Sequence, residues 1–402
     1  MNARLLPVLV VALVLVAAIV SITPWPVGTI QDDATYVILA KSLASGEGYR
    51  QLNLPGAPRV THYPPGYPLF LAGLWRIWPD FPNNIVVFKY ANAFLLALAA
   101  LGAYAFARKR MQLNAATAGV AALAGTACVL VLYVSSVVLS EALFLALLFP
   151  GLLAADDAVR KGTVPAAVAA GALGGVLALV RTIGIALVPA VVLALVLRKR
   201  WGAAVAALAT SIGVLAPWQI WANAHARDIP DVVSAKYGGY LSWMVSGYRE
   251  GGWDFAQGVL ARNGADLQRL LDYLVLPVTS SSLRTIAFRV FLVILLIGLT
   301  WLVRRAPAAV LFVLSYAAIV LLWPFEVIRF VMAGFPLLVL LFVAGCTAIW
   351  QWRPQSFAAH VPRALLVVGA AGVAGGFAVY NVRGYREQWW TSVQRDSGER
   401  IT

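Results

Sequence analysis

The run LLPVLVVALVLVAAIVSI, residues 5–22, contains no charged side chain and is followed by Thr-Pro-Trp-Pro. As an α-helix it is long enough to cross the ~30 Å hydrocarbon core of a bilayer. Similar apolar runs follow, without the alternation of transmembrane β-strands. The chain is therefore predicted to be an all-α, polytopic membrane protein. About eleven transmembrane helices are expected, near residues 5–22, 84–107, 115–133, 137–155, 164–180, 182–197, 201–221, 286–303, 307–323, 329–350 and 364–380.

The composition agrees with a membrane protein. Hydrophobic residues make up 61% of the 402 residues and charged residues 12%, whereas soluble domains carry ~25% charged residues. Much of the net charge of +14 lies in short loops between apolar runs, as membrane topology requires. We therefore expect the lipid bilayer, and no nucleic acid, as a partner. Cys128 and Cys346 fall in apolar runs, which argues against a disulfide framework or a thiolate metal site.

Basic clusters between the apolar runs indicate the orientation. Placing them in the cytoplasm with Arg4 makes every other connection external. The chain is then a multi-pass protein of the inner (plasma) membrane, with its N-terminus inside and its C-terminus outside. Residues 5–22 are interpreted as a retained span, because no convincing cleavage site follows them. The cytoplasmic clusters are Arg108-Lys109-Arg110, Arg160-Lys161, Arg198-Lys199-Arg200, Arg304-Arg305, and Arg353 with Arg363.

We expect one membrane-embedded domain over residues 1–402. Two long connections, 23–83 and 222–285, are predicted to be external, as is a short tail over 381–402. Within the first connection, segments 32–45 and 66–78 have helical apolar spacing and aromatic ends. They are predicted to be helices that lie in the membrane interface rather than cross it.

Two adjacent carboxylates, Asp32 and Asp33, open the polar part of the first connection. The polar stretch that they open ends in the turn-rich run His62-Tyr63-Pro64-Pro65-Gly66-Tyr67-Pro68, and Tyr36 follows the acids by one helical turn. In a chain that otherwise keeps acids away from its apolar segments, this placement points to chemistry at the outer membrane surface.

Three further ionisable residues fall at the same depth in this topology. Glu141 lies near the outer end of a span, Arg181 lies in a short external turn, and Arg329 follows Glu326 at the outer start of a span. A charge inside the bilayer needs a partner or a water-filled cavity. An outer-facing cavity that joins carboxylates to guanidinium groups satisfies all of them, and ion pairs that merely hold helices together are the alternative.

Other chemistries have little support. The three histidines have no ligand spacing, so a zinc site is not expected, and His62 is a loop residue that either touches ligand or lies on the surface. No Walker loop, dinucleotide fingerprint or Gly-x-Ser-x-Gly elbow is present. A substrate that reacts here therefore arrives already activated, and a lipid-linked phosphate is the natural form. Arginine suits such a group because its planar fork offers paired donors.

The chain resembles the glycosyltransferase C superfamily, and in particular bacterial relatives of the protein O-mannosyltransferases and the lipid A aminoarabinose transferases. The resemblance covers most of the chain through its order of spans, but its motifs are short. They are Asp32-Asp33-Ala34-Thr35-Tyr36, Gly48-Tyr49, His62-Tyr63-Pro64-Pro65-Gly66-Tyr67-Pro68-Leu69, Ser140-Glu141, Leu179-Val180-Arg181, and Arg329-Phe330 before Phe335-Pro336.

This resemblance implies a glycosyltransferase C fold and an inverting transferase. It would move a hexosyl or pentosyl group from a polyprenyl-phosphate donor to a lipid, glycan or protein acceptor on the external side. Asp32 matches the family's general base, and Asp33 stands where glutamate is usual. Tyr63 replaces a lysine that contacts donor phosphate in the aminoarabinose transferases, so Arg59, His62, Arg181 or Arg329 would supply that contact. Tyr36, Tyr67, Glu141 and Glu326 would line the pocket.

Cofactor and function alternatives stay open at this level. No cofactor is certain; a divalent metal is possible but not favoured, because arginines can stabilise a departing phosphate. A transporter or flippase would use Glu141 and Arg181 as pathway residues, although these lie at one face rather than at the midplane. A polysaccharide polymerase or ligase with a pyrophosphate-linked donor would use arginines of the second connection. These are Arg227, Arg249, Arg262, Arg269 and Arg284.

Overall fold

A computed structural model describes residues 5–23, 27–28, 30, 32–228, 240–353 and 356–391. Within these ranges the regular elements are all helices, and the only strand-like pairing is an isolated bridge between Arg50 and Arg59. The all-α prediction is confirmed for this part of the chain. The helices are α1 (Leu6–Val20), α2 (Asp32–Ala44), α3 (Gly66–Ile77), α4 (Asn84–Lys109), α5 (Ala115–Thr126), α6 (Val129–Ser135), α7 (Glu141–Lys161), α8 (Val164–Val180), η1 (Thr182–Ala186), α9 (Leu187–Leu197), α10 (Trp201–Ala224), α12 (Tyr240–Val275), α13 (Ser281–Leu302), α14 (Pro307–Leu322), α15 (Ile328–Gln351), α16 (Phe357–Glu387) and η2 (Trp389–Thr391).

Several of these helices could span a membrane, as a multi-pass protein requires. By length and hydropathy, 6 of those described qualify, and the number rises to 7 if the bent pair α5 and α6 forms one span. They are α4, α7, α10, α13, α15 and the part of α16 from His360. Four further predicted spans correspond to shorter apolar helices: α1, α8, the combined segment Thr182–Leu197, and α14.

The expected span over residues 115–133 is broken rather than continuous. Helices α5 and α6 meet at an angle of 55°, because Cys128 between them has extended backbone. A break inside an apolar region leaves backbone groups that need partners. Helix α16 supplies them: Asn381 Oδ1 accepts from the Val129 amide at 2.9 Å, and the Tyr385 hydroxyl donates to the Ala127 carbonyl at 2.6 Å.

The second long connection, 222–285, is largely helical. Helix α12 runs from Tyr240 to Val275 and is interrupted at Gly252, whose φ of 51° suits a residue without a Cβ. The predicted tail is also partly helical, because α16 continues to Glu387 and η2 follows. Residues 392–402 of that tail, like Arg4 at the other end, lie outside the described residues.

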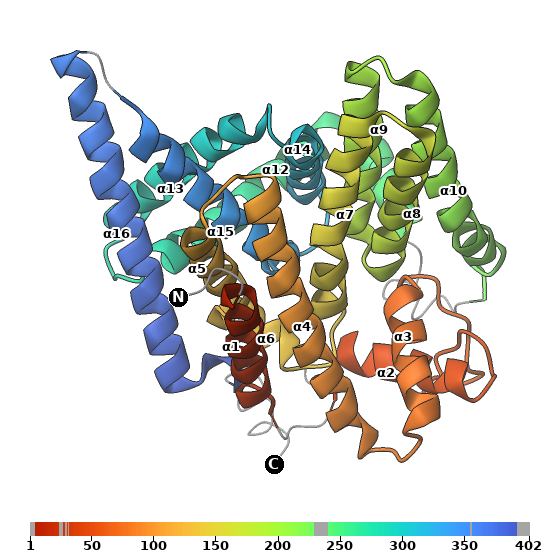
Figure 1. Cartoon of the computed structure of the whole chain (residues 1–402). Coiled ribbons are helices and arrows are strands. Elements are labelled where there is room, and N and C mark those ends of the chain that lie inside the picture. Colours follow the sequence, from red (N-terminus) through yellow and green to blue (C-terminus); the bar gives the residue numbers. More distant parts are fainter. Residues whose placement is uncertain are drawn as a thin grey trace.

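The arrangement brings the first connection beside the central helices. In α7, 61% of the most apolar window is buried, against 11% in α16, so α7 is central and α16 peripheral. Figure 1 shows α16 at one edge of the molecule and α8 to α10 on the opposite flank. Helices α2 and α3 gather beside one end of α4 and α7, and α2 runs across their direction. Their starts agree with the predicted segments 32–45 and 66–78, and their ends agree to within a residue.

Candidate active site

Helix α2 presents its two acids to different surroundings. Both lie in its first turn, where the helix dipole favours negative charge. Asp33 is 1% exposed and accepts hydrogen bonds from the amides of Gly28, Ile30 and Ala34 at 2.9–3.3 Å. Burial raises the pKa of Asp33, with these hydrogen bonds opposing the shift. Asp33 therefore fixes the chain that leads into α2, while Asp32 faces another cluster of side chains.

A group of tyrosines lies beside Asp32, and one of them, Tyr63 of the turn-rich run, contacts it directly. The Tyr63 hydroxyl donates to Asp32 Oδ1 at 2.8 Å. Tyr36 packs edge-on against the rings of Tyr63 and Tyr67, with centroids 5.4 and 5.1 Å apart. The Tyr49 hydroxyl donates to the Tyr63 carbonyl at 2.9 Å and holds the loop from behind. Burial raises the pKa of Tyr36 and of Tyr67, which keeps both phenols protonated at neutral pH.

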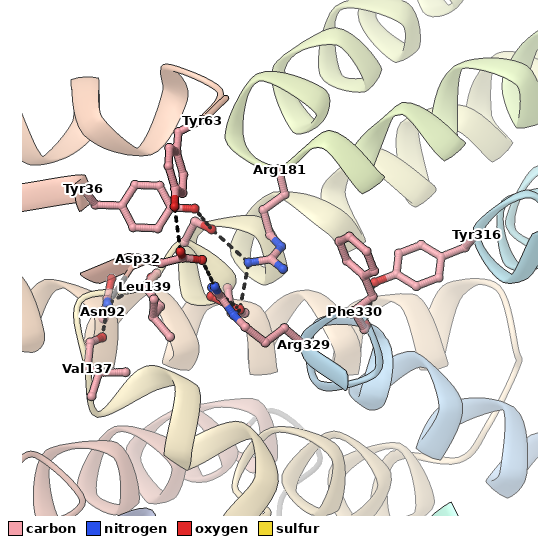
Figure 2. Close-up of polar contacts among 12 residues, drawn as sticks. Asp32, Tyr36, Tyr63, Asn92, Val137, Leu139, Arg181, Tyr316, Arg329 and Phe330 are labelled. Atoms are coloured by element: carbon pink, nitrogen blue, oxygen red, sulfur yellow. Dashed lines mark hydrogen bonds and ion pairs between the residues drawn. The ribbon is translucent and has the colours of Figure 1, made fainter. Parts of the chain in front are cut away.

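A glycine joins this loop to the arginine between α8 and η1. A Cβ on Gly66 would lie 2.7 Å from the carbonyl oxygen of Leu179, so only glycine permits the close approach. Two residues further on, Arg181 has extended backbone and ends α8. The break directs its side chain toward Asp32 and Arg329 (Figure 2).

Asn92 in α4 positions the start of α7. Residues 136–140 between α6 and α7 are not helical, and their free carbonyls need donors in an apolar setting. Asn92 Nδ2 donates to the carbonyls of Val137 and Leu139 at 2.9 and 3.2 Å, while Asn92 Oδ1 accepts from the Tyr67 hydroxyl at 3.1 Å. This places Glu141, the first residue of α7, at the centre of the cluster.

Four charged side chains from four segments meet there. Figure 2 labels three of them, Asp32, Arg181 and Arg329. Arg329, in the first turn of α15, contacts Asp32 Oδ2 through Nη1, and its Nη2 lies 2.7 Å from Glu141 Oε1. Arg181 Nη1 lies 2.8 Å from the same Glu141 oxygen and 3.0 Å from Ser140 Oγ. Glu141 is fully buried, so its charge depends on both guanidinium groups.

A cavity of about 210 Å³ lies against this cluster. Its polar lining includes Asp32 and both arginines, and an aromatic segment closes the other side. Exposure separates the two arginines: the Arg181 side chain is 7% exposed and the Arg329 side chain 27%, close to the 28% of Asp32. Arg329 and Asp32 are therefore the charged pair that a ligand in the cavity can reach. The lining residues are Asp32, Tyr36, His62, Tyr63, Pro64, Arg181, Thr182, Trp323, Phe325, Glu326, Arg329 and Phe330.

Seven of the eleven predicted site residues line the cavity, Glu141 lies in the adjoining charged cluster, and the other three lie elsewhere. Asp33 is turned to the Gly28 segment, and Tyr67 is buried beneath Tyr36. Arg59 forms an ion pair with Asp228 at 2.9 Å and is absent from the cavity lining. Of the predicted residues, Asp32, Tyr36, His62, Tyr63, Arg181, Glu326 and Arg329 line the cavity, and Glu141 pairs with both arginines.

The sequence analysis assigned no site role to Asn92, to Ser140 or to the aromatic wall of Trp323, Phe325 and Phe330. Asn92 carried a usable signal, because an isolated amide in an apolar run needs a partner inside the protein. Ser140 and Phe330 appeared only as members of short motifs, and Trp323 and Phe325 had no signal beyond their proximity to Arg329. Which face of a loop meets a cavity is set by the packing of distant helices.

Among the described residues, no three His, Cys, Asp or Glu side chains come together as a metal site. The chain matches no protein-family model and no curated protein.

Proposed function

We propose that this protein is an inverting membrane glycosyltransferase that transfers a sugar from a polyprenyl-phosphate donor to an acceptor hydroxyl on the external side. In this proposal Asp32, rather than Asp33, is the general base. Arg329 and Arg181 stabilise the departing phosphate. The resemblance of the short motifs supplies the reaction class, and the geometry of the cluster supports these roles.

The observation that carries the proposal is the meeting of one accessible carboxylate with two arginines in a single cavity. Asp32 comes from α2, Arg181 from the break after α8, and Arg329 from α15. Such a combination can accept a proton and stabilise an anion within one site. Asp33 lacks this access, because it is buried and its carboxylate already accepts three amide hydrogen bonds.

In the proposed step one proton moves, one bond to the anomeric carbon forms and one breaks. The acceptor oxygen attacks the anomeric carbon from the face opposite the phosphate, and its proton moves to the Asp32 carboxylate. The bond between the anomeric carbon and the phosphate oxygen breaks, and its electron pair leaves with the polyprenyl phosphate. The guanidinium groups offset the charge that grows on the phosphate. Inversion at the anomeric carbon follows from this single displacement.

Arg329 must change partners for this step to occur. In the structure its guanidinium group contacts Asp32 Oδ2 and so occupies an oxygen that would otherwise be free to accept the proton. A donor phosphate in the cavity would compete for Arg329 and release Asp32. Glu141 would keep a partner throughout, because Arg181 lies 2.8 Å from it. Donor binding before acceptor binding is the expected order.

An apolar cavity beside the site supports a lipid-linked donor. Its volume is about 170 Å³, it lies among α12 to α15, and Phe330 lines both it and the polar cavity. We propose that the phosphate of the donor lies beside Arg329 and that the first part of its isoprenoid chain occupies this apolar cavity on the other side of Phe330. The loop arginines of the pyrophosphate alternative do not line the polar cavity.

The proposal includes the topology and the fold inferred from sequence. Eleven spans, the glycosyltransferase C architecture and a location in the inner membrane require α1, α8, η1 with α9, and α14 to cross the bilayer. The basic clusters then lie in the cytoplasm, and Asp32 lies outside. Labelling of single cysteines on either face of intact cells measures this orientation directly.

Turnover by Asp32→Asn tests the catalytic role. The full chain is reconstituted in nanodiscs with radiolabelled polyprenyl-phosphate-hexose and a cell-envelope extract as acceptor. Loss of the base should lower transfer about 10²–10⁴-fold, while donor binding remains because both arginines are intact. Full turnover by Asp32→Asn would refute the assignment.

Two variants provide the controls. Asp80→Asn changes an exposed carboxylate of the same connection, whose described contact is with Asn83, and should transfer as the unmodified protein does. Arg329→Ala should weaken binding of polyprenyl phosphate, whereas Arg269→Ala, with a side chain 81% exposed, should not. No binding of polyprenyl phosphate to the unmodified protein would reject the transferase proposal itself.

A further inference from the structure

The segment between α14 and α15 forms one wall of the cavity. Trp323, Phe325 and Phe330 are packed edge-on, with the Trp323 ring 5.8 and 5.4 Å from the other two. Glu326 lies within this aromatic group and lines the same cavity. Aromatic faces beside a carboxylate suit a sugar ring, because C–H groups pack on the rings while hydroxyls donate to the acid.

Glu326 carries the uncompensated charge of this site. Arg181 and Arg329 offset Glu141 and Asp32, and each of those acids has an arginine within ion-pairing distance. No ion pair or hydrogen bond joins Glu326 to another of the described residues, although its side chain is exposed to the cavity. The carboxylates of Asp32, Glu141 and Glu326 outnumber the guanidinium groups of Arg181 and Arg329 by three to two before any phosphate enters.

Helix α12 fixes the position of this wall. Asn263 is fully buried, and its Nδ2 donates to the carbonyls of Val320, Leu321 and Trp323 at 2.7–3.1 Å. Three hydrogen bonds to the last turn of α14 hold the backbone from which the Glu326 segment begins. A charge held on a fixed wall selects among ligands more sharply than one on a mobile loop.

We propose that Glu326 is a specificity-determining residue, which makes the cavity selective for neutral or amino sugars over uronic acids. The inference rests on the proposed function and names its substrate class. A sugar carboxylate would face Glu326 with no cation left to offset it, and the donor phosphate adds a further negative charge. Like charges in such a confined site repel one another, so discrimination arises by repulsion as well as by attraction.

Donor binding tests the inference without knowledge of the acceptor. The probes are polyprenyl-phosphate-glucose, polyprenyl-phosphate-glucuronic acid and polyprenyl phosphate alone, titrated against the full chain in nanodiscs. The two sugars differ only at C6, where a hydroxymethyl group replaces a carboxylate. We expect the glucose donor to bind at least about tenfold more tightly, and Glu326→Gln to reduce that ratio about tenfold.

Two matched variants sharpen the result. Glu326→Asp keeps the charge and should keep a preference for glucose. Glu47→Gln removes an exposed acid of the first connection, outside the cavity lining, and should leave the ratio unchanged. Size-exclusion chromatography checks that each variant folds.

The outcomes separate the two proposals. Equal binding of both sugar donors, or a ratio that persists in Glu326→Gln, would overturn the specificity role while polyprenyl phosphate still bound. Absence of binding by polyprenyl phosphate alone would overturn the proposed function, and the inference with it. A ratio lost in Glu326→Gln and retained in Glu326→Asp and Glu47→Gln would support both.

Discussion

The two ends of α7 carry similar charges in different settings. At one end, Glu141 meets Arg181 and Arg329 beside a cavity. At the other, Asp156 is fully buried and accepts from the Ala308 amide at 3.0 Å, and Asp157 pairs with Arg110 at 2.6 Å. Both ends therefore combine acids with arginines.

The two ends of α7 differ in whether their charged groups remain accessible to a ligand. Arg110 and Arg160 also donate to backbone carbonyls, of Leu153 and Arg305, so they join helices together. Asp156 supplies an acceptor to the N-terminus of α14, where backbone amides need one. At the Glu141 end, Asp32 and Arg329 remain partly exposed to a cavity that also contains Glu326. A cluster of opposite charges becomes a candidate site only when part of it faces space that a ligand can fill.

Removing the buried acid at the site should have the largest effect on stability. Glu141→Gln leaves two guanidinium groups without their shared anion, and breaking a buried pair on one side costs about 3–5 kcal/mol. Thermal unfolding followed by size-exclusion chromatography measures the loss, with Glu47→Gln as the exposed control. A Glu141→Gln protein as stable as the control would show that the pairing is not structural.

Asn92→Ala should have an effect on stability comparable to that of Glu141→Gln and should link structure to activity. Three hydrogen bonds are lost, and two buried carbonyls before α7 lose their donor, at about 1–3 kcal/mol per unsatisfied group. Transfer should also fall, because Glu141 follows directly. An exposed amide, Asn83, provides the matched control as Asn83→Ala. Normal turnover in Asn92→Ala would mean that α4 does not position the site.

Asp156→Ala should separate the two ends of α7. Loss of an acceptor at the start of α14 is expected to cost about 0.5–2 kcal/mol of stability. Donor affinity should stay unchanged, because Asp156 does not line the cavity. The two measurements are thermal unfolding and titration with polyprenyl phosphate. A large fall in donor affinity would show that the two ends of the helix are coupled.

Arg59→Ala should have the smallest effect. Its ion pair with Asp228 is partly exposed, with side chains 38% and 34% accessible, and exposed pairs contribute about 0–1 kcal/mol. Binding of polyprenyl phosphate should therefore match that of the unmodified protein. A marked loss of affinity would instead restore Arg59 to the donor site for which the sequence made it a candidate.

Much of the helical framework followed from sequence, because apolar runs bounded by basic loops indicate helices that are apolar enough to cross a bilayer. The starts of α2 and α3 were also predictable, since Asp32 and the Pro-Pro-Gly turn are local helix-start signals. The break at Cys128 could not be predicted, because the side chains that stabilise it come from the distant helix α16. Asn381 accepts from the Val129 amide, and Tyr385 donates to the Ala127 carbonyl. The helical character of the second long connection was missed as well, since α12 is polar along much of its length.

The candidate site was also predictable from the sequence only in part. Sequence singled out Asp32, Glu141, Arg181 and Arg329, because charged residues at the ends of apolar runs demand partners. It could not distinguish Asp32 from Asp33, which differ by one position in chain order. The two side chains diverge because α2 turns one toward the Gly28 segment and the other toward Arg329.

The sequence by itself determined the all-α, membrane-like character of the chain, much of the helical framework and a short set of charged residues, because hydropathy and charge act locally along the chain. Only the tertiary structure decided which of these residues share a cavity, since that depends on how α2, α7, α8 and α15 pack. It also left Glu326 without an ionic partner among the described residues, because the available guanidinium groups lie against Asp32 and Glu141.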